Sequence, residues 1–96
     1  MDSTGTVIVN NVINEILHGV PRTNSVSVLL AQRERLELLM STASSHQTWS
    51  VSDRELLSNC FEAVIGLLRN DEFETRIGAP IAEARAFCRR LIASLG

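Results

Sequence analysis

Apolar positions recur along most of this chain at intervals of three and four residues, which is the spacing of one face of a helix. The first such segment covers residues 7–19. Its apolar positions are Val9, Val12, Ile13, Ile16 and Leu17. Valine and isoleucine also favour strands, but the helical period is the better guide here. Gly19 and Pro21 follow in the order that ends a helix.

The same pattern predicts helices over residues 25–43, 52–70 and 80–95, and a short helical turn over 71–78. We expect residues 1–6 to form a leader without fixed structure. The segment 41–50 is rich in serine and threonine, so it is expected to contain a loop. Its single tryptophan, Trp49, is expected to fold back over one end of the molecule.

The third helix has the clearest start. Ser52 is a suitable N-cap, and Glu55 stands three residues later, as in a capping box. Val51 and Leu56 have the spacing of a hydrophobic staple. On a helical wheel the apolar arc of this helix spans roughly 200°, well beyond what a surface helix needs.

So wide an arc indicates burial against more than one neighbour. Self-association is the simplest source, and a two-fold homodimer is the commonest closed arrangement. The side chains expected in the interface are Leu30, Leu38, Leu56, Ile65 and Leu67. The alternative is that the 71–77 segment and Trp49 cover this surface within one chain.

Composition supports one globular domain over residues 1–96, because 45% of the residues are hydrophobic and 21% are charged. We therefore predict an all-α fold, an antiparallel bundle of about four helices. The chain has no apolar run of membrane-spanning length, and its N-terminal residues lack the features of a signal peptide, so we expect a cytoplasmic protein. A formal net charge of −2 argues against nucleic acid as the main partner.

Candidate chemistry is sparse. Cys60 and Cys88 fall on apolar helix faces, which is typical of buried, unreactive thiols. His18 and His46 lie in different segments, and His46 falls in the predicted loop, unlike the histidine of a phosphotransfer bundle. No spacing matches a metal site, a catalytic motif or a nucleotide-binding loop. We expect no enzymatic activity and no cofactor.

These observations favour a helical protein–protein interaction module of adaptor, chaperone-like or immunity type, which also self-associates. The alternative is a DNA-binding regulator that uses the last helix, where Arg85, Arg89 and Arg90 are candidate contacts. Against it, the three arginines do not form one stripe.

Overall fold

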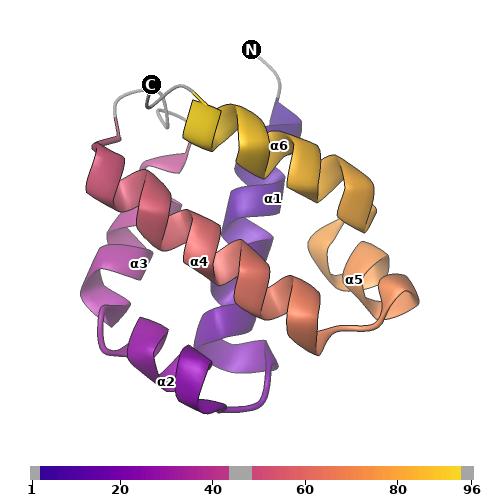
Figure 1. Ribbon diagram of the computed structural model, residues 1–96, viewed down its shortest axis with the longest axis horizontal. Helices are drawn as coiled ribbons and strands as arrows, with labels where there is room; N and C mark the ends of the chain where they lie inside the picture. Colours follow the sequence, from indigo (N-terminus) through magenta and orange to yellow (C-terminus); the bar gives the residue numbers. More distant parts are fainter. Residues whose placement is uncertain (1–2, 44–48, 94–96) are drawn as a thin grey trace.

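The computed structural model describes residues 3–43 and 49–93, and within these ranges it contains helices and no strand (Figure 1). The all-α class is therefore confirmed. The elements are α1 (Ser3–Asn14), a π-helical turn η1 (Glu15–Gly19), α2 (Asn24–Leu30), α3 (Arg33–Ser41), α4 (Val51–Leu67), α5 (Asn70–Ile77) and α6 (Ile81–Ala93).

The described part of the chain folds around α1. This helix runs behind α4 in Figure 1 and packs against α3, α4 and α5, while α4 and α6 lie side by side in front. The fully buried side chains of α1 include Ile8, Val9, Val12 and Ile13. They meet Leu57, Phe61 and Val64 of α4 in one hydrophobic core. The whole measures 30 × 27 × 23 Å.

The number of helices exceeds the expected four because the predicted helix 25–43 is split and because α5 is a helix of its own. The break falls at Ala31 and Gln32, where Gln32 has φ −108° and ψ 31°. In an unbroken helix Arg33 would lie on the buried face between Leu29 and Leu36. The break places Arg33 in solvent, where its Nε donates to Glu37 Oε1 at 3.0 Å.

Both ends of the chain also differ from expectation. The first helix begins at Ser3 rather than Val7, so residues 3–6 belong to α1 and not to a leader. Residues 1–2 lie outside the described residues. The short turn expected near residues 71–78 is the complete helix α5, which ends at Gly78 in the left-handed conformation with φ 88°.

The predicted start of α4 is wrong by two residues. Ser50, not Ser52, is the N-cap, and its Oγ accepts from the backbone N–H of Asp53 at 3.1 Å. With Ser50 as the cap, Val51 is the first residue of α4 rather than the residue before the cap, so Val51 and Leu56 do not have the positions of a hydrophobic staple. Val51 is 52% exposed. Trp49 is buried and packs in the core.

A π-helical turn ends the first helix. Glu15 is the first residue of this turn, and its side chain is buried, 8% exposed. A Cβ at position 19 would stand 2.1 Å from Glu15 Oε1. Gly19 therefore leaves the space that this carboxylate occupies.

Candidate protein-binding surface

The outer face of α3 presents an exposed leucine. Leu38 is 60% exposed and shares this face with Glu34, Glu37 and Ser41, all of them exposed. The opposite face of α3 buries Leu36 and Leu39 in the core. Leu38 is therefore a large apolar side chain that the described residues do not cover.

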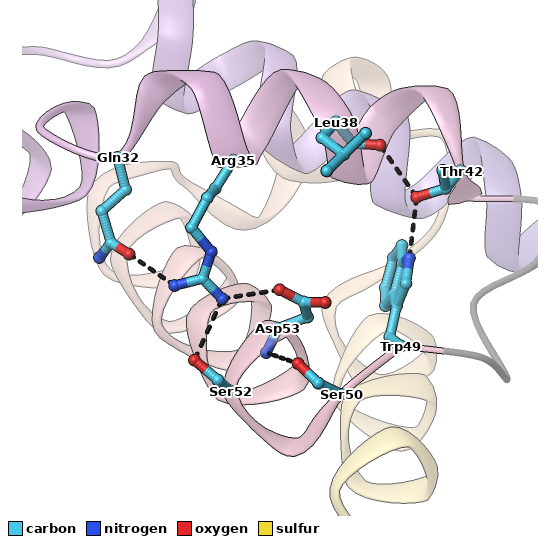
Figure 2. Close-up of polar contacts among 8 residues, drawn as sticks. All are labelled: Gln32, Arg35, Leu38, Thr42, Trp49, Ser50, Ser52 and Asp53. Carbon is cyan, nitrogen blue, oxygen red and sulfur yellow. Dashed lines mark hydrogen bonds and ion pairs between the residues drawn. The ribbon is translucent and has the colours of Figure 1, made fainter.

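A polar cluster fixes α3 against the start of α4 (Figure 2). Arg35 Nη1 donates to Gln32 Oε1 at 2.9 Å, and its Nη2 donates to Ser52 Oγ at 3.1 Å and to Asp53 Oδ1 at 2.6 Å. The hydrogen bond from Arg35, helped by Ser50, lowers the pKa of Asp53 against the opposing effect of burial. The ion pair is a short, charge-assisted hydrogen bond, and its two side chains remain 39% and 29% exposed.

A second link lies next to Leu38, at the C-terminal end of α3. Thr42 Oγ1 donates to the Leu38 carbonyl oxygen and accepts from Trp49 Nε1, each at 2.9 Å (Figure 2). This chain of hydrogen bonds joins the last turn of α3 to the residue before the α4 cap. Together with Arg35 it holds α3 at two points, so the backbone beneath Leu38 is well fixed.

The four leucines and one isoleucine expected in an interface have different surroundings. Leu56 is 4% exposed and belongs to the core, so it offers no surface to a second chain. Leu30, Ile65 and Leu67 are half-buried and pack against the core. The wide apolar arc of α4 is covered within the chain, because α4 packs against α1, η1, α2 and α6. Only Leu38 keeps most of its surface.

The arginines considered for DNA are all exposed on α6. Arg85 and Arg89 lie one turn apart on one side of its outer face, and Arg90 lies on the other side. Within the described ranges, none of the three forms an ion pair.

An open hollow of about 420 Å³ lies between α5 and the start of α6. Its lining residues are Asn70, Asp71, Glu74, Pro80, Ile81 and Ala82. The hollow therefore combines two carboxylates with an aliphatic side. No sequence pattern indicated it, because its halves come from two separate helices.

Buried ionisable groups occur in the core as well. Burial raises the pKa of the Cys60 thiol to about 12 and also raises that of Cys88, which Glu62 reinforces and a hydrogen bond with Ser58 opposes. Both thiols are buried and unbridged, as predicted. Arg76 of α5 places its Nε 3.5 Å from the buried Glu15 Oε1. No sequence pattern indicated this pair.

The described residues hold no group of three or more His, Cys, Asp or Glu side chains placed to bind a metal ion. His46 lies outside the described residues. Nor does this part of the chain include a helix long and apolar enough to cross a membrane. Comparison of the chain with protein-family models, curated proteins and solved structures finds no significant match.

Proposed function

We propose that this protein is a helical protein–protein interaction module that binds its partner through the outer face of α3, centred on Leu38. The observation that carries the proposal is the exposure of Leu38, 60%, on a helix fixed to α4 at two points. Burying a leucine side chain on binding contributes about 1.5–3 kcal/mol. A fixed backbone lowers the entropy lost on binding.

The surroundings of Leu38 suit a protein partner. The residues that dominate the binding energy of an interface are surrounded by contacts that contribute little energy but exclude water. Glu34 and the Arg33–Glu37 ion pair stand on the same helix as such a rim. Glu34 has no ion-pair partner among the described residues, so a partner with a basic group beside an apolar pocket complements this face.

The partner at this face is another protein rather than a second copy. A two-fold contact through this face would place Leu38 against Leu38 of the second copy, so neither copy would offer the other a pocket. A different protein can supply an apolar pocket that receives Leu38. Adaptor, chaperone-like and immunity-type roles all use a contact of this kind.

The proposal is tested with a photo-crosslinking amino acid at Ser41, which lies one turn from Leu38 on the same exposed face. Irradiation in the native cells should give a defined adduct, identified by mass spectrometry. Leu38→Glu should abolish it. The matched control is Val51→Glu, which adds the same charge at another exposed aliphatic residue, 52% exposed on α4, and should leave it intact.

Two results would contradict the proposal. One is the absence of a protein adduct at Ser41 under conditions in which the probe reacts with added model protein. The other is an adduct that survives Leu38→Glu. Circular dichroism of each variant checks that the helices are intact.

A further inference from the structure

Neighbouring helices expose opposite charges at the C-terminal end of the chain. The exposed acidic residues of α5 are Asp71, Glu72 and Glu74, and Arg76, also exposed, pairs with Glu72. α6 exposes Arg85 and Arg89 one turn apart on one side of its outer face, while its other exposed charged residues, Glu83 and Arg90, lie on the other side. The two helices contact one another and are joined by Gly78 and the two residues after it. One surface of the molecule therefore carries both acidic and basic groups, which can pair with the same groups of a second copy.

The hollow between these helices has the chemistry of an arginine site. Asp71 and Glu74 supply carboxylates that accept hydrogen bonds from a guanidinium group. Pro80, Ile81 and Ala82 supply apolar atoms against which the methylene stem of an arginine packs. The volume, about 420 Å³, is ample for one such side chain.

The outer face of α6 allows a second helix to come close. Ala82, Ala86 and Ala93 recur on it at the spacing of one helix face, with Arg89 between the last two, and all four are exposed. The small side chains of Ala82 and Ala86, in the first half of this row, let two helix backbones approach closely there. Arg85 lies beside this row, one turn beyond the edge of the hollow.

We propose that two copies of the chain associate through α5 and α6 about a two-fold axis, so that Arg85 of each copy enters the hollow of the other. A two-fold contact places the same patch against itself and therefore requires a surface that carries both signs of charge. Arg89 adds a second attraction to the acidic side of α5. This interface is distinct from the α3 face and gives a dimer with two partner-binding faces, which raises avidity for a multivalent partner.

Nucleic acid is a poorer occupant of this surface. The carboxylates beside the arginines repel phosphates, and the chain as a whole has a formal charge of −2. A second copy of the chain can form ion pairs with both the arginines and the carboxylates.

Charge exchange tests this interface. We expect wild-type protein to dimerise in sedimentation at low salt, and to dissociate as salt rises. The variants Arg85→Glu/Arg89→Glu and Asp71→Arg/Glu74→Arg should each be monomeric, with dimer affinity reduced at least about tenfold, because each opposes like charges in both halves of the contact. Mixed in equal amounts, the two variants should form a heterodimer, since both contacts then regain opposite charges.

The control variant is Arg22→Glu/Arg90→Glu, which makes the same change in net charge at exposed arginines away from the hollow and should still dimerise. A monomeric wild type, or variants that fail to pair when mixed, would overturn the inference. Dimerisation that is unchanged in the first two variants would also overturn the inference, and that result would not affect the α3 proposal. Salt-sensitive binding of wild-type protein to a duplex DNA probe, lost in Arg85→Glu/Arg89→Glu, would instead assign the arginines to nucleic acid.

Discussion

Two serines at the start of α4 have different hydrogen-bonding partners. Ser50 Oγ accepts from the Asp53 backbone N–H, an amide that the helix itself leaves unbonded. Ser52 Oγ accepts from Arg35, and water can replace that contact because Ser52 is exposed. We expect Ser50→Ala to lower the free energy of unfolding by about 1 kcal/mol, and Ser52→Ala by less than about 0.5 kcal/mol. Urea denaturation followed by circular dichroism compares them, and equal losses would contradict the cap assignment.

The contribution of the α3–α4 junction to stability depends on pH through Asp53. Its pKa is lowered in the fold, first by the hydrogen bond from Arg35, so the folded state favours the carboxylate. Its contribution to stability is therefore complete above the unfolded pKa, about 3.9, and is lost as pH falls through the lower folded value. We expect Asp53→Asn to destabilise the protein at pH 7 and to have a smaller effect at pH 3. Urea denaturation of wild type and Asp53→Asn at both pH values measures the two differences in unfolding free energy. An equal difference at pH 7 and pH 3 would contradict this prediction.

At the scale of elements, the crossing of α1 and α6 depends on a glycine. A Cβ at Gly5 would lie 2.6 Å from Phe87 Cε2, and Phe87 is itself stacked on Phe61 with ring centroids 6.1 Å apart. Because the ring has little room to move, Gly5→Ala should destabilise the fold by about 1–3 kcal/mol. Gly66→Ala is the control. Nothing lies within 4 Å of a Cβ added at this position, so the higher helix propensity of alanine should stabilise α4 by about 0.5–1 kcal/mol. Thermal melts of the two variants should shift in opposite directions.

The ion pair between Glu15 and Arg76 joins η1 to α5. Arg76→Ala should destabilise the fold by about 1–3 kcal/mol, because it leaves a buried carboxylate without its cation. Adding Glu15→Gln should recover part of that loss. Denaturant curves for the single and double variants form a thermodynamic cycle, and strict additivity would show that the two side chains do not interact.

The helical period was sufficient to place most of the helices, because burial of one stripe decides where a helix forms. It did not place the α4 cap, since Ser50 and Ser52 are each followed three residues later by an acidic residue. The choice between them depends on Arg35, which contacts Asp53 from another helix. Leu38 was expected at the surface from its phase. Leu56 was not recognised as core, since the neighbours that cover it belong to distant segments.

At the scale of the whole molecule, the response to alkali is unusually simple. The chain has no lysine and no tyrosine, so the two thiols are the side chains that ionise between about pH 9 and 12. The folded state holds the pKa of Cys60 at about 12, whereas the unfolded chain releases this proton near its ordinary value. Stability is then complete below that value and falls as pH rises above it, by up to about 1.4 kcal/mol per pH unit for each thiol.

We therefore expect the free energy of unfolding to decline above about pH 9, and Cys60→Ala to flatten that decline. Urea denaturation at successive pH values under reducing conditions measures both slopes. Cys88→Ala is the companion variant, and its effect should be smaller because the Ser58 hydrogen bond offsets part of the burial. An unchanged slope in Cys60→Ala would contradict the assignment.

Trp49 gives the molecule a built-in optical reporter. It is the one tryptophan in a chain without tyrosine, and its indole N–H is bonded to Thr42, whose hydroxyl is bonded in turn to the Leu38 carbonyl. Emission excited at the red edge of the aromatic band therefore comes from this residue alone. We expect a protein that binds beside Leu38 to change the surroundings of this indole, and a shift of its emission would report the binding without any attached dye.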